Sequence, residues 1–292
     1  MRADEVSWTG LAADDLDDLI GLARRCRAAD GGLPLTAEPA FVRRRWAAEG
    51  STARLGRDAR GFLVAAAAVR VSGDVATVGT LVDPEARGHG LAAHLLDWGR
   101  AAAAHRAAAT IVETESLTAD QAAFFAERGM RQVFAEDVLR IDLTPPIAAP
   151  AWPDGAIVHA WDVATAPRFF AVYEAAFRER PGFPAPDAAT WIGDLDDDDD
   201  FRPAWSLLVE VPGWGDAGFV TAAVGWIDQV GVIPAARGRG LGATLTRASL
   251  SRMRADGATE AWLNVNVDNP TAKNVYLRLG FTESGRRARF AA

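Results

Sequence analysis

The feature that most constrains this chain is an internal repeat with a period of about 150 residues. Residues 82–92, VDPEARGHGLA, return as residues 232–242, VIPAARGRGLG. A second pair of segments, FAERGM at 125–130 and YLRLGF at 276–281, recurs at almost the same separation. Because both pairs keep one register over a long stretch, the sequence predicts two homologous domains and not one large domain.

A proline-rich segment separates the two copies. Residues 144–153 contain four prolines in ten positions. Such a stretch cannot continue a helix or a central strand, and it is typical of a semi-rigid linker. We therefore expect an N-terminal domain over residues 1–143, this linker over 144–153, and a C-terminal domain over 154–292.

Composition excludes several classes of function. The net charge of −8 argues against a nucleic-acid partner, which would require a basic surface. No apolar run approaches the ~18 residues of a membrane span, and the N-terminus lacks the pattern of a secretory signal. The single cysteine, Cys26, forms no internal disulfide and is typical of a reducing compartment. We expect a cytoplasmic protein without membrane or metal sites, and the sequence gives no indication of its oligomeric state.

Helical and strand patterns alternate in the same order in both copies. The expected helices cover residues 14–27, 91–108, 164–178 and 241–256. The expected strands cover residues 63–71, 75–82, 110–114, 207–211, 219–232 and 261–267. This order predicts an α/β chain with a mixed sheet in each domain.

The turn RGRGLG at residues 237–242 follows an apolar strand and opens a helix. Glycines let a backbone approach a ligand closely, and the N–H groups at a helix start favour an anion. A pyrophosphate is a natural ligand for such a turn, and Arg237 and Arg239 could add positive charge. The same turn could also serve only to connect the strand to the helix.

The spacing Arg-x-x-Gly-x-Gly in residues 237–242 resembles the acyl-CoA signature of the GNAT superfamily of N-acetyltransferases, and RGHGLA at 87–92 is a related match. Residues 264–281 resemble the later strand-and-helix motif of that family. The resemblance implies a tandem GNAT fold, in which each domain has a mostly antiparallel, splayed sheet flanked by helices. It also implies acetyl-CoA as the acyl donor.

The resemblance also implies a layout for the site. The family splays two neighbouring strands, here 226–232 and 261–267, to admit the pantetheine arm, and a backbone N–H near Val232 polarises the thioester carbonyl. Tyr276 stands where the family has the acid that protonates the leaving thiolate. The expected cofactor-binding residues are Val230, Val232, Arg237, Gly238, Arg239, Gly240, Leu241, Gly242, Asn269 and Tyr276, with a second set of Val82, Arg87, Gly88, His89, Gly90 and Ala92 in the first copy.

The candidate general base is Asp228, the only acidic residue of its expected strand. An amine must lose a proton before it attacks, and a strand carboxylate acting through water can accept that proton. Each catalytic assignment has a structural alternative: Tyr276 could be an aromatic plug, and Asp228 could be an acid that faces solvent.

The first copy serves as an internal control. Phe125 corresponds to Tyr276, and Val78 corresponds to Asp228. Neither side chain can donate or accept a proton, although the glycine turn is kept. The N-terminal domain is therefore expected to be non-catalytic, whether it still binds CoA or only supports its partner.

Three functions remain open at the level of sequence. The first is N-acetylation of a primary amine on a small molecule, with the chemistry in the C-terminal domain. The second is narrower: the chain resembles mycothiol synthase, a tandem GNAT protein with a degenerate N-terminal half, which implies a cysteinyl amine as acceptor. The third is a non-catalytic CoA-binding scaffold or sensor, against which the presence of Tyr276 and Asn269 argues.

Overall fold

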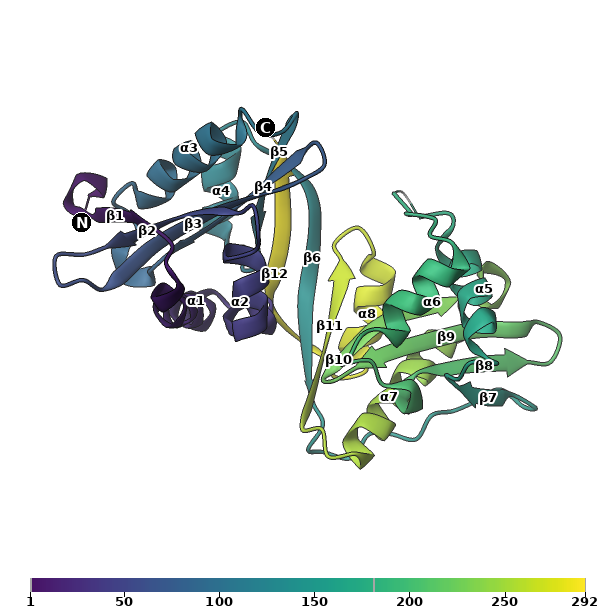
Figure 1. The fold of residues 1–292 in the computed structure, drawn as a ribbon. Coiled ribbons are helices and arrows are strands. Elements are labelled where there is room, and N and C mark those ends of the chain that lie inside the picture. Colours follow the sequence, from purple (N-terminus) through teal and green to yellow (C-terminus); the bar gives the residue numbers. More distant parts are fainter. Residues whose placement is uncertain (1, 181, 292) are drawn as a thin grey trace. The chain divides into compact units, whose positions relative to one another are not determined.

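The computed structural model describes residues 2–180 and 182–291, which form two compact units (Figure 1). Unit 1 runs up to Val138 and also includes the chain from Ser284 on, whereas unit 2 covers Leu139–Glu283. The division differs from the expected domains 1–143 and 154–292 in the last strand, which lies in unit 1. The last strand belongs to unit 1 because its residues 288–291 pair with residues 111–114 of that unit.

The sheet of unit 1 has the strand order β1-β2-β3-β4-β5-β12-β6. Its pairs are antiparallel from β1 to β4 and between β5 and β12, while β4 and β5 are parallel. The strands are β1 (Ser7–Gly10), β2 (Thr52–Arg57), β3 (Leu63–Ser72), β4 (Val75–Val82), β5 (Ala109–Thr114), β6 (Arg131–Asp142) and β12 (Thr282–Ala291). The helices are α1 (Leu16–Asp30), α2 (Pro39–Trp46), α3 (Leu91–Ala103) and α4 (Ala119–Glu127).

Helices cover both faces of the unit 1 sheet, and β3 shows this in its sequence. Ala66 and Ala68 pack into the core beneath α1 and α2. Ala65 and Ala67 point the other way, into the core beneath α3. Because both faces are covered, β3 reads as a continuous apolar run and not as an alternating one.

The C-terminal strand β12 completes unit 1. Its residues 288–291 pair antiparallel with residues 111–114 of β5, and Figure 1 shows this yellow strand beside β5. The ring of Phe290 lies 4.5 Å from the ring of Phe125, centroid to centroid. Backbone pairing and aromatic packing therefore hold the end of the chain in unit 1.

Unit 2 repeats the same plan with the order β11-β10-β9-β8-β7. Its pairs are antiparallel except for β10 and β11, which are parallel. The strands are β7 (Ile157–Ala160), β8 (Leu207–Val211), β9 (Gly215–Ala223), β10 (Trp226–Val232) and β11 (Glu260–Asn266). The helices are α5 (Ala166–Phe177), α6 (Ala188–Asp196), α7 (Leu241–Ala255) and α8 (Pro270–Arg278).

The apolar stretch expected as one strand over 219–232 is two strands, β9 and β10. They are separated by a tight turn at Val224 and Gly225, where Gly225 has a φ of 72°. A glycine adopts this left-handed conformation without the steric cost that a side chain would bring. The turn lets β10 fold back on β9 and reach the glycine-rich segment that follows.

The proline-rich linker at residues 144–153 contains neither helix nor strand. It is nevertheless attached to α7, because the Thr244 hydroxyl donates to the Ala151 carbonyl (3.1 Å) and Arg254 Nη2 donates to the Thr144 carbonyl (3.4 Å). Trp152 packs against the core of unit 2. The linker is therefore a packed part of unit 2.

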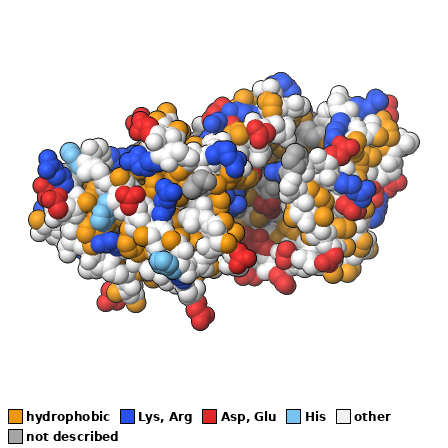
Figure 2. Space-filling view, turned by 90° about the horizontal axis from the view of Figure 1, so that it is seen from above, with side chains coloured by type: hydrophobic (Ala, Val, Ile, Leu, Met, Phe, Trp, Pro, Cys, Tyr) orange, Lys and Arg blue, Asp and Glu red, His pale blue; other side chains and the backbone are white. Residues whose placement is uncertain are grey.

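The molecular surface carries charges of both signs. Figure 2 shows Lys and Arg side chains interspersed with Asp and Glu over the viewed face. No helix within the described ranges is both long and apolar enough to span a membrane. In the same ranges, no three His, Cys, Asp or Glu side chains gather closely enough to hold a metal ion.

Candidate active site

The two parallel strands of unit 2 part soon after they meet. β10 and β11 share one residue pair, Trp226 with Trp262, where the Trp262 N–H donates to the Gly225 carbonyl (2.9 Å). In unit 1, by contrast, β4 and β5 stay paired over five residues, from Val75 with Ala109 to Gly79 with Glu113. The expected splay is therefore present in unit 2, and in unit 1 the corresponding strands stay paired further along, up to Gly79 with Glu113.

Because β10 and β11 separate, backbone N–H groups of β10 are left without a strand partner on the side of β11. The Ile233 N–H donates to the Ala217 carbonyl of β9 (3.0 Å). Since N–H groups alternate in direction along an antiparallel strand, those of Val230 and Val232 are directed away from β9. They face the edge of β10 that is not paired with β11. The sequence predicts a backbone N–H near Val232 as the donor to the acyl carbonyl, and that group lies at this edge.

The glycine turn between β10 and α7 has the geometry of an anion cradle. Gly238 and Gly240 have φ values of 75° and 82°, and a Cβ at either position would meet no atom within 4 Å. The helix begins at Leu241, so its first N–H groups have no partner inside the helix. In unit 1, Gly88 and Gly90 have φ values of 81° and 86°, and the turn is therefore the same in both units.

The two arginines of the turn have different environments. Arg237 donates from Nε to the Val232 carbonyl (3.2 Å) and from Nη2 to the Ala176 carbonyl (2.8 Å). Its guanidinium thus braces the turn against the strand end and α5, a role that the sequence did not indicate. Arg239 lies over the ring of Trp214, 4.6 Å from the centroid, and has no ion pair among the described residues. Its hydrogen-bond donors are available to a phosphate.

The brace is also present in unit 1. Arg87 donates from Nε to the Val82 carbonyl (3.2 Å) and forms a bidentate pair with Asp30, with both contacts at 2.7 Å. His89 takes the position of Arg239. The first arginine of each turn therefore fixes the local backbone, and unit 1 lacks the second arginine.

Tyr276 lies on α8, half-buried against the core of unit 2. Its ring meets the ring of Phe281 edge to face, with centroids 5.8 Å apart. Burial raises the pKa of the phenol to about 12. The hydroxyl therefore keeps its proton throughout the neutral range, as a proton donor must before the reaction.

Asp228 is the extra residue of a β-bulge in β10. The register with β9 shifts between Ile227, which pairs with Ala222, and Gln229, which pairs with Thr221. Asp228 is exposed to solvent, although nearby protein atoms partly desolvate its carboxyl group. This partial burial, assisted by the negative charges of Asp198 and Asp200, raises the pKa of Asp228 to about 7.

Unit 1 lacks both the acid and the bulge. The β3–β4 register runs without interruption from Ala65 with Val82 to Ser72 with Val75. Val78 is fully buried, next to Gly99 of α3. The backbone change that presents Asp228 at an accessible position is therefore absent together with the carboxylate.

Asn269 caps α8, since its Oδ1 accepts from the Ala272 N–H (3.1 Å). Thr118 plays the same part for α4 by accepting from the Gln121 N–H (3.2 Å). The observed role of Asn269 is thus structural, as for many residues at a helix start. The cap occupies the amide oxygen and leaves the amide nitrogen able to donate.

Three polar side chains that the sequence did not single out lie on the sheet face opposite α7. Buried oxygens of Thr221, Gln229 and Asn264 have no hydrogen-bond partner among the described residues. Their direct neighbours in sequence, Val220, Val230 and Leu263, pack into the core against α7, so these polar groups project to the other side. Unpartnered buried oxygens are uncommon in folded proteins and indicate a place for a ligand or water. In the sequence, these residues could have been found as isolated polar residues inside apolar strands.

The comparison with known proteins agrees with this geometry. The Acetyltransferase (GNAT) family model matches residues 157–281. A mycothiol acetyltransferase from Nocardioides sp. is 33% identical, over 94% of this chain and 95% of the relative.

Two solved structures share the fold over nearly the whole chain. A GCN5-related N-acetyltransferase from Sphaerobacter thermophilus aligns with a TM-score of 0.80 and 24% identity, covering 100% of this chain and 96% of the other. A tandem GNAT protein of the clavulanic acid biosynthesis pathway aligns with a TM-score of 0.67 and 20% identity, covering 99% and 98%. From the relative's identity along nearly the full length, together with the repeated fold, we conclude that the chain belongs to the GNAT family and is a tandem-domain acetyltransferase.

Proposed function

We propose that unit 2 transfers an acetyl group from acetyl-CoA to a primary amine of a small molecule. The observation that carries the proposal is the unpaired edge of β10, which ends at a glycine turn with open space around its backbone. A thioester arm needs such an edge for its amides, and a pyrophosphate needs such a turn.

The residues present fit acetyl-CoA, which when bound would supply an activated acetyl thioester. The N–H groups of residues 238–242 and the Arg239 guanidinium would hold the phosphates. The N–H groups of Val230 and Val232 would hydrogen-bond to carbonyls of the arm, including the carbonyl on which negative charge develops. Arg237 would act indirectly, by holding the turn against the strand end.

Proton transfers are assigned to Asp228 and Tyr276. With a pKa of about 7, Asp228 is part-ionised at neutral pH and can accept the proton of an incoming ammonium, directly or through water. The Tyr276 hydroxyl holds a proton that it can donate to the departing sulfur. Its raised pKa makes it a moderate acid, so a modest contribution to the rate is expected.

The acceptor that we propose is the cysteinyl amine of a mycothiol precursor. The relative from Nocardioides sp., which matches along nearly the whole chain, is named a mycothiol acetyltransferase. The free oxygens of Thr221, Gln229 and Asn264 would suit an acceptor with several hydroxyl or amide donors. Asp198 and Asp200 add negative charge near Asp228, which favours a cationic amine.

Unit 1 is proposed to be non-catalytic. Phe125 and Val78 replace the acid and the base, and β4 and β5 pair over five residues where β10 and β11 share one pair. Its glycine turn could still bind CoA.

We also propose that the reaction takes place in the cytoplasm, since the single cysteine of the chain is a free, buried thiol.

Release of free thiol from acetyl-CoA in the presence of an amine panel tests the proposal. The panel should include the desacetyl mycothiol precursor, glucosamine and free amino acids. Turnover that is highest with the precursor supports the specific acceptor, and turnover with another amine supports only the general activity. Acetyl-CoA binding without turnover on any amine would favour a scaffold or sensor.

A further inference from the structure

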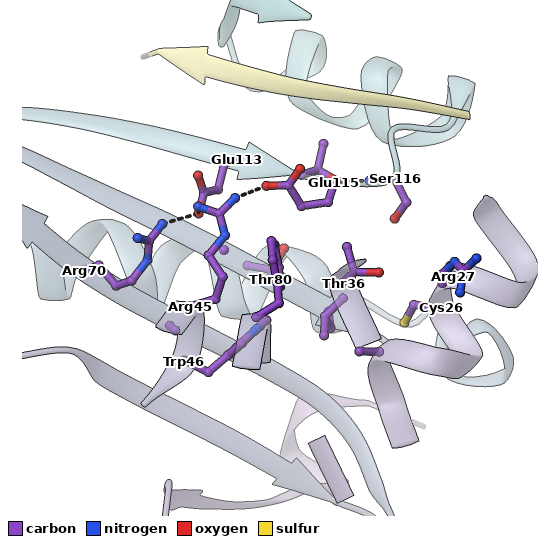
Figure 3. Close-up of a pocket in the computed structure, with 16 residues that line it drawn as sticks. Cys26, Arg27, Thr36, Arg45, Trp46, Arg70, Thr80, Glu113, Glu115 and Ser116 are labelled. Carbon is purple, nitrogen blue, oxygen red and sulfur yellow. Dashed lines mark hydrogen bonds and ion pairs between the residues drawn. The ribbon is translucent and has the colours of Figure 1, made fainter. Parts of the chain in front are cut away.

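Unit 1 contains a cavity on the sheet face covered by α1 and α2 (Figure 3). It encloses about 580 Å³ of space free of atoms, including the part open to solvent. About 60 Å³ of this space is available to the centre of a water molecule, which is room for a few ordered waters or for a small ligand that replaces them. Its lining includes no residue of the glycine turn 87–92, so the cavity is separate from the CoA-like cradle of this unit.

One end of the cavity carries a network of buried charges. Arg45 pairs with Glu113 (2.7 Å) and with Glu115, and Arg70 also pairs with Glu113 (2.5 Å). These groups come from α2, β3 and the end of β5, and Figure 3 shows them facing one another. Burying such a network costs free energy, and good mutual geometry recovers that cost only in part. A binding function would explain why charged groups are kept there.

Two side chains of the cavity keep hydrogen-bonding capacity that no described residue uses. Oε1 of the Glu115 carboxylate is paired with Arg45, whereas Oε2 is buried, accepts no hydrogen bond among the described residues and lies 3.9 Å from Arg287 Nη1. Arg27 of α1 lines the cavity and forms no side-chain hydrogen bond or ion pair within the described part of the chain. In Figure 3, Arg27 lies beside Cys26, across the cavity from Glu113 and Glu115.

The rest of the lining is suited to a small organic molecule. Hydroxyl groups are supplied by Thr36, Thr80 and Ser116, and aromatic surface by Phe41 and Trp46. Arg27 at one end, without a side-chain partner among the described residues, and the carboxylates of Glu113 and Glu115 at the other would match a ligand with an acidic group and an amino group. We propose that the unit 1 cavity binds a small zwitterion of the free amino-acid class, with its carboxylate at Arg27 and its ammonium at Glu115.

The proposal assigns unit 1 a ligand that does not take part in the acetyl transfer of unit 2. Binding can be measured without turnover, so its outcome does not depend on the proposed function. The probes are the twenty L-amino acids, screened against the full chain by ligand-observed NMR with acetyl-CoA present. Each hit is then compared by calorimetry with its analogues lacking the amino or the carboxyl group. We expect at least one amino acid to bind and both analogues to bind at least tenfold more weakly.

Two variants locate the binding in unit 1. Gly79→Leu should fill the cavity, because a Cβ at Gly79 would meet no atom within 4 Å and the residue lines the cavity. Arg27→Gln should weaken binding by about tenfold or more through loss of a charge-assisted contact. Arg24→Gln, an exposed change on the same helix, is the matched control and should leave the affinity unchanged.

Thermal melts establish that each variant is folded. If Gly79→Leu does not fold, the affinity of Arg27→Gln alone shows whether the amino acid binds in the unit 1 cavity. The proposal is overturned if no amino acid binds the parent chain at millimolar concentration. It is equally overturned if Arg27→Gln binds the hits as tightly as the parent, since binding would then lie elsewhere, for example at the acceptor site of unit 2.

Discussion

The ring of Tyr276 meets the ring of Phe281 edge to face, with centroids 5.8 Å apart and planes at 66°. In unit 1 the aligned residue, Phe125, packs against Phe290 at 4.5 Å. The repeat therefore keeps a ring under the sheet in both units and places a hydroxyl on it only in unit 2. Packing alone would be served by either residue, so the hydroxyl is the part that needs a chemical explanation.

Tyr276→Phe should remove the proton donor and keep the packing. The structure shows no hydrogen bond from this hydroxyl among the described residues, so stability should change by about 1 kcal/mol or less. We expect kcat to fall by roughly 100-fold, the lower end for general acid catalysis, because water can substitute in part. The KM for acetyl-CoA should change little, since the hydroxyl matters mainly as charge develops on sulfur.

Steady-state kinetics with a matched thermal melt provides this measurement. An unchanged melt with kcat within twofold of the parent would make Tyr276 a packing residue, as Phe125 is.

The pKa of about 7 at Asp228 predicts a pH dependence. Below that pH the carboxyl group is protonated and cannot accept a proton from the amine, so kcat/KM should fall about tenfold per pH unit. Asp228→Asn should lower kcat strongly and abolish this dependence apart from the titration of the amine itself. A profile with the same inflection in Asp228→Asn would show that another group is the base.

Asp198 and Asp200 should set the position of that inflection. Their negative charges raise the pKa of Asp228, so replacing both by Asn lowers it and moves the acid limb to lower pH. Because the amine substrate is the same in both enzymes, the shift between variant and parent reports the enzyme group. Identical profiles for the parent and the double variant would show that these carboxylates do not act on the base.

Removal of the C-terminal strand should destabilise unit 1. A chain that stops after Glu283 loses the pairing of β12 with β5 and the ion pair between Arg286 and Asp137 (2.7 Å). It also loses Phe290, which is 3% exposed. We expect limited proteolysis to cut first within unit 1, at residues below 138, while unit 2 stays protected.

A single substitution in β12 tests the same assignment with a smaller change to the chain. Phe290→Ala should cost about 3–5 kcal/mol, as for other buried aromatic residues, whereas the neighbouring exposed change Arg289→Ala should cost less than about 1 kcal/mol. Equal melts for the two variants would contradict the assignment of β12 to the core of unit 1.

Much of the fold could be predicted because local signals agreed with the repeat. The hairpin expected at 63–71 and 75–82 is observed as β3 and β4, and the helix expected at 241–256 is α7. Turn glycines, apolar runs and helix starts are local properties, so they can be read from a single sequence.

The features that could not be predicted depend on tertiary pairing. Both copies end in a similar strand, and nothing local indicates that β12 pairs with β5. The bulge at Asp228 likewise appears only when β10 is set against β9. The unpartnered oxygens of Gln229 and Asn264 become informative only because the structure shows that no protein group reaches them.

The central claim is that acetyl transfer takes place in unit 2 alone. It is tested most directly by initial rates of thiol release for a matched pair, Gly240→Phe and Gly90→Phe. The two glycines have φ values of 82° and 86° and equally open surroundings, so each substitution brings the same backbone strain of roughly 1–2 kcal/mol. With both variants folded by thermal melt, we predict that Gly240→Phe loses at least 100-fold in kcat/KM for acetyl-CoA and that Gly90→Phe stays within threefold of the parent. Equal losses in the two variants would contradict the account, because unit 1 would then take part in the chemistry.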